Sequence, residues 1–306
     1  MAAPEAPSLP ASDSRPLSPQ IDRSYRAPKL KLPPGACDTH FHFIGPQSLY
    51  PMKPNHIFSH LRFEDTTIED WLKLQSALGL SRGLHVQSMM YENIYQLMLH
   101  AQCRMPDRIR SVAIPSVDVT DKELDILTKA GVVGYRMTWR LSKKPDERII
   151  ARVAEHGWQI HWLIHGEHTE DWKSKVLASP GNFVIEHLGG VRPEQGLDGP
   201  DFTFVKRCLE TGRGWVKISP RPSKKQTFPF DDMKPFARWL VENAPDRVLW
   251  GSDWPHPQYF KPMVNDIDLL DEMLDWVPEA DLRQKIFVDN PETLFRFDPN
   301  KRTAVA

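Results

Sequence analysis

Short apolar segments alternate with longer amphipathic segments along most of the chain, from about residue 36 onward. The short segments are rich in β-branched and aromatic residues, which favour strands, and the longer ones have the spacing of amphipathic helices. We expect eight strands, at residues 36–43, 82–88, 109–115, 133–139, 159–165, 182–188, 215–220 and 247–253. Eight rounds of strand and helix predict a parallel sheet closed into a single (β/α)8 TIM barrel of the α/β class.

The ends of the predicted helices carry local signals. Thr66 and Thr120 precede two helical segments and are expected N-caps, because their hydroxyl groups can accept hydrogen bonds from the first turn. Gly79 and Gly131 are expected to stop the same helices, since glycine readily adopts the left-handed conformation that ends many helices. A doubly wound open sheet would instead require a glycine-rich phosphate turn after an early strand, and the sequence has none.

The first 33 residues differ from the rest of the chain in composition. They are rich in Pro, Ser and Ala, so we assign 1–33 to an irregular, flexible N-terminal tail and 34–306 to the barrel. The tail lacks the basic start and apolar core of a secretory signal, and no apolar run reaches the roughly 20 residues that span a membrane. With three cysteines and no paired spacing, the protein is expected to be cytoplasmic.

The overall charge restricts the kinds of molecule that the protein is expected to bind. Lysine and arginine total 39 and aspartate and glutamate total 40, which gives a formal net charge of −1. This balance provides no general attraction to nucleic acid or to acidic membranes. We therefore expect a small-molecule substrate, with no nucleic-acid or membrane partner and with homo-oligomerisation left open.

Titratable side chains gather where the predicted strands end. His40 and His42 alternate with two phenylalanines, so both imidazoles lie on one face of the first strand. This pair alone is a weak signal of a metal site or catalytic cavity, because two core histidines would give the same pattern. In a TIM barrel, however, the active site forms at the C-terminal ends of the strands. Four predicted strands end in metal-competent residues, which are His40, His42, His165, His187 and Asp253.

Four segments resemble the amidohydrolase superfamily, namely CDTHFHF, IEHLGG, DRVLWGSDWPHP and FVDNPETLF. Within this superfamily the chain is similar to the branch that contains 2-pyrone-4,6-dicarboxylate lactonase, over residues 34–297. The resemblance implies that His40 and His42 face the barrel centre. It also implies that Asp253 binds metal or moves a proton, and that His187 lies close to the substrate.

The resemblance further implies a cofactor and substrate contacts. We expect one divalent metal ion, with zinc preferred and metal-free operation as the alternative. The expected metal ligands are His40, His42, His165 and Asp253. Two arginines resemble those that hold a substrate carboxylate in the pyrone lactonases. With two further candidates, the expected substrate-binding residues are Arg136, Arg221, Gln87 and His256.

Three positions leave alternatives open. His161 shares a strand face with His165, which we prefer as the ligand because it lies nearer the C-terminal end. Arg136 sits in an apolar strand, so its guanidinium either pairs with a carboxylate of the protein or binds an anion. Lys217 also lies in a predicted strand, but no motif marks it as a carbamylated bridge, which disfavours a site with two metal ions.

The sequence predicts a hydrolase that opens a lactone or similar cyclic ester of a carboxylate-bearing small molecule. Asp253 would activate water as the general base, and His187 is the second expected catalytic residue. A metal-dependent, non-oxidative decarboxylase of an aromatic or unsaturated acid is the alternative on the same site. A third hypothesis is a non-catalytic binding barrel, which the titratable residues at the strand ends disfavour.

Overall fold

The computed structural model describes residues 13–141, 145–165, 170–225, 227–257, 260 and 262–302. Its strands form one sheet in which each strand pairs in parallel with the next along the chain. The eight strands are β1 (Cys37–Phe41), β2 (Arg82–Val86), β3 (Ile109–Ala113), β4 (Val132–Thr138), β5 (Gln159–Leu163), β6 (Phe183–Ile185), β7 (Gly214–Ile218) and β8 (Val248–Trp250). A parallel bridge from Phe41 to Trp254 joins the two ends of the sheet. The predicted TIM barrel is confirmed.

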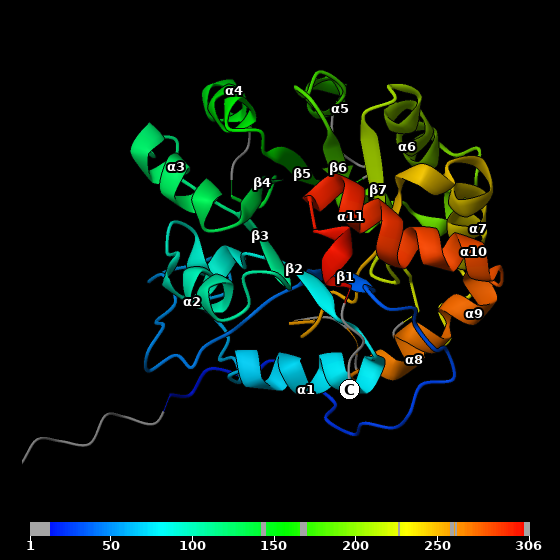
Figure 1. Cartoon of the computed structure of the whole chain (residues 1–306), viewed down its shortest axis with the longest axis horizontal. Coiled ribbons are helices and arrows are strands. Elements are labelled where there is room, and N and C mark those ends of the chain that lie inside the picture. Colours follow the sequence, from blue (N-terminus) through cyan, green and yellow to red (C-terminus); the bar gives the residue numbers. More distant parts are fainter. Residues whose placement is uncertain are drawn as a thin grey trace, which may run out of the picture.

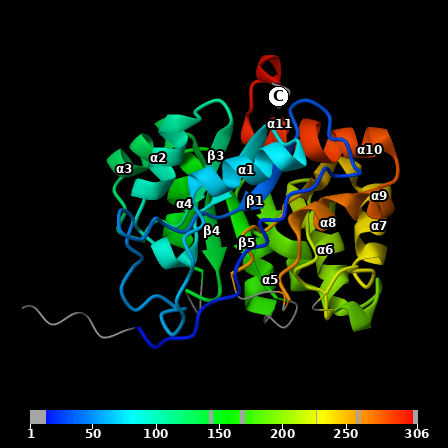
Figure 2. The ribbon, with the colours of Figure 1, turned by 90° about the horizontal axis from the view of Figure 1, so that it is seen from below.

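Helices surround the sheet (Figures 1 and 2). They are α1 (Ile68–Leu78), α2 (Gln96–Arg104), α3 (Asp121–Lys129), α4 (Glu147–Glu155), α5 (Glu170–Leu177), α6 (Pro200–Glu210), α7 (Lys234–Asn243), α8 (Asp266–Asp271), α9 (Met273–Trp276), α10 (Ala280–Gln284) and α11 (Asn290–Phe295). Short 3-10 turns are η1 (Met89–Tyr91), η2 (Glu186–Gly190), η3 (Pro193–Gln195), η4 (Pro245–Arg247) and η6 (Pro299–Lys301), and η5 (Lys285–Asp289) is a π-turn. The helices that follow the strands bury their apolar faces against the outside of the barrel.

The helix signals in the sequence are correct except at one end. Thr120 caps α3 and accepts a hydrogen bond from the Glu123 backbone N–H, and Gly79 ends α1 in the left-handed conformation. The expected cap Thr66 is wrong, because its backbone exchanges hydrogen bonds with Ile44 across an antiparallel bridge. The next residue, Thr67, caps α1 instead.

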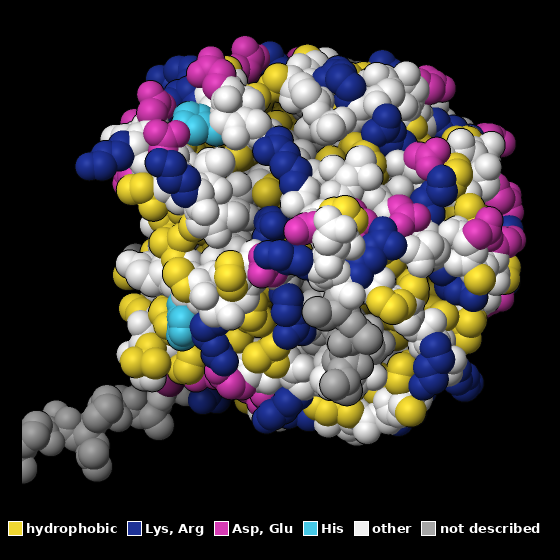
Figure 3. Space-filling view, in the orientation of Figure 1, with side chains coloured by type: hydrophobic (Ala, Val, Ile, Leu, Met, Phe, Trp, Pro, Cys, Tyr) yellow, Lys and Arg dark blue, Asp and Glu magenta, His cyan; other side chains and the backbone are white. Residues whose placement is uncertain are grey.

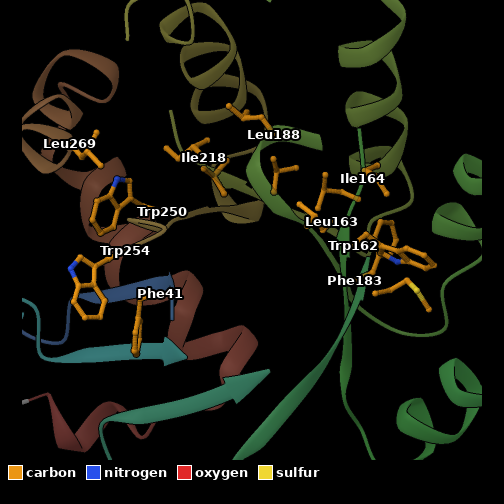
Figure 4. Packing of buried hydrophobic residues seen from close by; sticks show 14 of the residues in the cluster. Phe41, Trp162, Leu163, Ile164, Phe183, Leu188, Ile218, Trp250, Trp254 and Leu269 are labelled. Carbon is orange, nitrogen blue, oxygen red and sulfur yellow. The ribbon is translucent and has the colours of Figure 1, made fainter. Parts of the chain in front are cut away.

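The two ends of the barrel interior differ in character. At the N-terminal ends of the strands, inward-facing apolar side chains form a cluster with Leu294, Phe295 and Phe297, at and after α11. A larger apolar cluster fills the space between the strands and the helices, and Figure 4 shows part of it around Trp250 and Trp254. The C-terminal half of the interior instead holds buried histidines and charged groups. This polar half is where a TIM barrel carries its active site.

A local irregularity in β1 sets the direction of the His40 and His42 side chains. The pairing of β1 with β2 shifts register between Asp38 and Phe41, which is the signature of a bulge. Beyond this shift, Phe41 stacks on Trp71 outside the sheet, with their ring centroids 4.2 Å apart. Because side chains alternate along a strand, His40 and His42 turn to the opposite face, into the barrel.

The seam between β1 and β8 is closed by a carboxylate. Asp38 is fully buried, and its Oδ2 accepts a hydrogen bond from the Ser252 hydroxyl at 2.6 Å. Its Oδ1 accepts from the backbone N–H groups of Ser252 and His40, each at 3.0 Å. The Asp253 N–H then donates to the His40 carbonyl at 2.8 Å. These bonds hold the segment after β8 against the end of β1.

The described part of the tail, residues 13–33, lies along the outside of the barrel, next to α1 and α8 (Figure 1). Arg26 forms ion pairs with Asp268 and Asp271 of α8, and Arg23 pairs with Glu64. On the face drawn in Figure 3, acidic and basic side chains are interspersed. Among the described helices, none is both long enough and apolar enough to cross a membrane.

The seam generates a stability prediction. Replacing Asp38 by Ala leaves one hydroxyl and two backbone donors without their acceptor in a buried place, so the free energy of unfolding should fall by about 2–4 kcal/mol. Asp38→Asn keeps an acceptor and should lose less. Urea denaturation followed by circular dichroism measures both values. As a control, Asp121→Ala removes the exposed partner of Arg152 and should cost less than about 1 kcal/mol. Equal losses for Asp38→Ala and this control would contradict the role of the seam.

Candidate active site at the C-terminal end of the barrel

Three imidazoles converge on one carboxylate oxygen. The distances from Asp253 Oδ1 are 3.5 Å to His40 Nε2, 3.4 Å to His42 Nε2 and 3.7 Å to His187 Nε2. All four side chains are buried. The structure therefore brings together four of the predicted site residues, from β1, from η2 after β6 and from the segment after β8.

The backbone at this cluster is strained. His187 and Leu188 have φ values of 51° and 55°, and Asp253 has a φ of 65°. Non-glycine residues rarely adopt this left-handed conformation, and the strain persists only where surrounding contacts impose it. Here β6 ends at Ile185 and β8 at Trp250, so His187 and Asp253 lie just beyond their strands and turn back over the barrel centre.

Hydrogen bonds fix the tautomers of two of the imidazoles. The Nδ1 of His42 lies 2.6 Å from the Val86 carbonyl oxygen, which can only accept, so this nitrogen carries the proton. The Nε2 of His187 lies 2.8 Å from Arg221 Nη1, which can only donate, and its Nδ1 is 2.9 Å from the Ser219 hydroxyl. In the neutral state both rings therefore carry a lone pair on Nε2, the nitrogen nearer Asp253.

The electrostatics favour neutral imidazoles around an ionised carboxylate. Burial lowers the pKa of His40, His42 and His187, and most strongly those of His40 and His187. Burial opposes the charge of Asp253, but the nearby Arg221 guanidinium favours it, and the pKa of this carboxyl is lowered below its ordinary value. Neutral imidazole and ionised carboxylate are the forms that bind a metal ion.

The donor set fits a divalent cation. Two groups of residues, among those that the structure describes, have ligand atoms within 4.8 Å of one another: His40, His42 and Asp253, and His40, Glu186 and His187. The lone pair of His42 Nε2 and the ionised oxygen of Asp253 face each other at 3.4 Å, and neither can donate. A cation or a proton donor between them would relieve this repulsion. A site for one divalent metal ion is consistent with the arrangement.

The expected metal ligand His165 is not part of this cluster. His165 is half-buried, and its ring packs edge-on against Trp139, with centroids 5.5 Å apart. It belongs to neither candidate metal group, because β5 ends at Leu163 and the chain then leaves the strand direction. The rival His161 is fully buried and packs on Phe295, toward the apolar end of the barrel.

Arg136 pairs with a carboxylate of the protein. Its Nε and Nη2 each donate to Glu186 Oε2 at 3.0 Å, and both side chains are buried. This is one of the two alternatives that the sequence left open. Glu186 was not predicted, although an acidic residue in an apolar strand, directly before His187, was a signal for it.

Gln87 and His256 also have other partners. The Gln87 amide accepts a hydrogen bond from the Ile114 N–H at 2.6 Å, and donates to the carbonyls of Tyr91 and Ile94 at 2.5 and 2.9 Å. His256 Nε2 lies 3.0 Å from Asp266 Oδ1, and both residues are buried. These two side chains brace the loops around the site, and we leave them out of the proposed substrate contacts.

A family model described as amidohydrolase matches residues 37–297. The chain belongs to the amidohydrolase family. The match begins at β1, which carries His40 and His42, and it ends after α11. It therefore includes every residue of the cluster described above.

Two relatives in this family extend over nearly the whole chain. The 4-sulfomuconolactone hydrolase of Hydrogenophaga intermedia is 33% identical over 279 residues, covering 87% of this chain and 90% of the relative. The 2-pyrone-4,6-dicarboxylate hydrolase of Comamonas testosteroni is 32% identical over 284 residues, covering 88% and 92%. A solved structure from Pseudomonas putida superposes with a TM-score of 0.76 at 24% identity, over 87% of this chain and 99% of that one, which supports the fold.

The charge balance around Asp253 can be tested without substrate. In chelator-treated protein, the side-chain carbon of Asp253 should show no titration by ¹³C NMR down to about pH 4. In Arg221→Met the leading influence that lowers this pKa is lost while burial remains, so the pKa should rise. Arg192→Met, which removes the partner of Asp201, is the matched control and should leave Asp253 unchanged. An unaltered Asp253 titration in Arg221→Met would refute this account of the charge balance.

Proposed function

We propose that this protein hydrolyses a lactone or similar cyclic ester of a small molecule that bears a carboxylate. The observation that carries the proposal is the convergence of His40, His42 and His187 on Asp253 in the buried C-terminal half of the barrel. Such a site combines an ionised base with imidazoles that can hold a cation or polarise a carbonyl. The lactone and pyrone hydrolases named above support the reaction class, since a 2-pyrone is itself a cyclic ester.

The proposed reaction adds one water molecule across the ring ester. Asp253 accepts a proton from water as the oxygen of that water bonds to the carbonyl carbon. The bond from this carbon to the ring oxygen then breaks, and the proton held by Asp253 passes to the leaving oxygen. The product is the open-chain hydroxy acid, or its keto form where the ring oxygen was enolic. The low pKa of Asp253 keeps the base ionised at neutral pH.

One divalent ion, which we propose to be zinc, would be held by His40 Nε2, His42 Nε2 and Asp253. When bound, such an ion lowers the pKa of water from 15.7 toward about 7 and polarises a carbonyl oxygen. His187, which follows β6, would then contact the substrate from the side of the barrel facing β1. Its Nε2 is held by Arg221, which orients the ring over Asp253.

Arg221 is the proposed anchor for the substrate carboxylate. Its Nη1 lies 2.8 Å from His187 Nε2 and 3.5 Å from Asp253 Oδ2, which places the guanidinium at the reaction centre. Its side chain keeps 12% of its surface exposed, whereas Arg136 is closed off at 2%. A guanidinium matches a carboxylate with paired, charge-assisted hydrogen bonds. The sulfonate and carboxylates in the names of the two relatives are anionic groups of the same kind.

The role of Asp253 as general base predicts a large loss of kcat/KM when its carboxylate is replaced by an amide. Asp253→Asn keeps the shape but removes the basicity, so kcat/KM on the best of a panel of carboxylate-bearing lactones should fall at least about 100-fold, with the fold intact. His187→Asn should lose less, because the proposed role of this ring is to orient the substrate and Arg221 rather than to accept the proton of water. Asp201→Asn removes another buried carboxylate, away from the site, and serves as the control. Near-parental turnover in Asp253→Asn with an inactive His187→Asn would reverse the two roles, and carbon dioxide as the product would exclude hydrolysis.

The anchor role of Arg221 predicts a selective defect. In Arg221→Met the KM for the acid substrate should rise about 10-fold or more, because the charge-assisted pair is lost, while the KM for the neutral methyl ester should change little. Steady-state rates on the acid and its ester measure the two effects. Arg192→Met is again the control. A rise in KM of the same size for acid and ester would show that Arg221 only supports the fold.

A further inference from the structure

A second layer of buried charge lies beneath the reaction centre and takes no part in the steps above. It consists of Lys217 on β7, Glu186 in η2 and Arg136 on β4, each almost fully excluded from solvent. Barrel interiors are usually filled by branched apolar side chains, and buried ions are costly unless paired. The Arg136–Glu186 pair accounts for two of these charges. It leaves open what the Lys217 ammonium and the second oxygen of Glu186 do.

Both of these groups face the same nitrogen of His40. The Lys217 Nζ lies 3.4 Å from His40 Nδ1, and Glu186 Oε1 lies 3.8 Å from the same atom. Arg136 holds the other oxygen of Glu186, Oε2, and thereby fixes the direction in which Oε1 points. Within the described residues, Glu186 Oε1 and His40 Nε2 are buried without a hydrogen-bond partner.

Lys217 and Glu186 favour opposite tautomers of His40. A neutral imidazole has one N–H, an ammonium can only donate, and an ionised carboxylate can only accept. If Lys217 donates to Nδ1, the His40 proton lies on Nε2, which then points at Asp253 Oδ1 as a hydrogen-bond donor. If Nδ1–H donates to Glu186, the lone pair lies on Nε2, where a cation can use it.

We propose that Lys217 and Glu186 compete for His40 Nδ1 and so set how tightly the group of His40, His42 and Asp253 holds a divalent cation. Lys217 weakens metal binding by holding the proton on Nε2, and Glu186 strengthens it. Both are positioning residues, since they act through His40. This inference rests on the metal site of the proposed function. It singles out His40 because the tautomers of His42 and His187 are already fixed by Val86 and Arg221.

The competition predicts opposite effects of two substitutions on metal binding. Removal of a group that orients a metal-bound histidine typically changes metal affinity by about 10- to 100-fold. In Lys217→Met the Zn²⁺ affinity should therefore rise about 10-fold or more. In Glu186→Gln it should fall by a similar factor, because the new amide can donate to Nδ1. Isothermal titration of metal-stripped full-length protein with Zn²⁺, without substrate, measures both. Lys206→Met, which removes an ammonium from α6 on the outside of the barrel, should leave the affinity unchanged.

A second readout reports on the tautomer itself. In chelator-treated protein with ¹⁵N-labelled histidine, the His40 signals, assigned by their loss in His40→Gln, should place the proton on Nε2 in the parent and on Nδ1 in Lys217→Met. A parent protein with the proton on Nδ1 would overturn the proposal, even if the Lys217 variant failed to fold. Equal Zn²⁺ affinities of Lys217→Met and the parent, or the absence of Zn²⁺ binding by both, would also overturn the proposal.

These measurements separate this inference from the proposed function. Lactone hydrolysis that depends on Asp253, together with a Zn²⁺ affinity unaffected by Lys217, would overturn only the tautomer competition. Opposite shifts in Zn²⁺ affinity in a protein without lactonase activity would support the competition and refute the proposed reaction.

Discussion

The hydrogen bonds of Asp38 across the β1–β8 seam are the constraint on which the site depends. The base and the two histidines of β1 are far apart in sequence, and they meet only because the segment after β8 is held against the end of β1. One buried carboxylate binds the backbone of His40 and both the backbone and the hydroxyl of Ser252. The next residue, Asp253, is then fixed by its own N–H to the His40 carbonyl. The distances from Asp253 to His40 and His42 follow from this short chain of contacts.

The division of the barrel interior explains how a stable fold can carry so many buried charges. Its N-terminal half is closed by apolar packing against α11, which adds to the hydrophobic stabilisation from the larger cluster between strands and helices. Its C-terminal half pairs each buried cation with an acceptor: Arg136 with Glu186, Arg221 with His187, and Lys217 with His40. Such pairs are costly to break and weakly stabilising, so their presence is better explained by chemistry than by stability.

Much of the architecture followed from the sequence because it depends on local periodicity. The alternation of strands and helices predicted the barrel, and the period of two along β1 placed His40 and His42 on one face. Contacts between segments that are distant in the sequence could not be predicted in this way. Periodicity cannot decide between a substrate and Glu186 as the partner of Arg136, and it cannot show that the Gln87 amide binds three backbone groups. The predicted fifth strand runs to residue 165, whereas β5 ends at Leu163, and His165 lies outside both candidate metal groups.

The central claim is that water adds to a ring carbonyl at the cluster around Asp253. The most direct measurement is ring opening of a carboxylate-bearing lactone in H₂¹⁸O, with the position of the label found by mass spectrometry. The proposed reaction predicts one ¹⁸O atom in the newly formed carboxylate and none in the hydroxyl or keto group left by the ring oxygen. Label in that second group, or a product that has lost carbon dioxide, would contradict it.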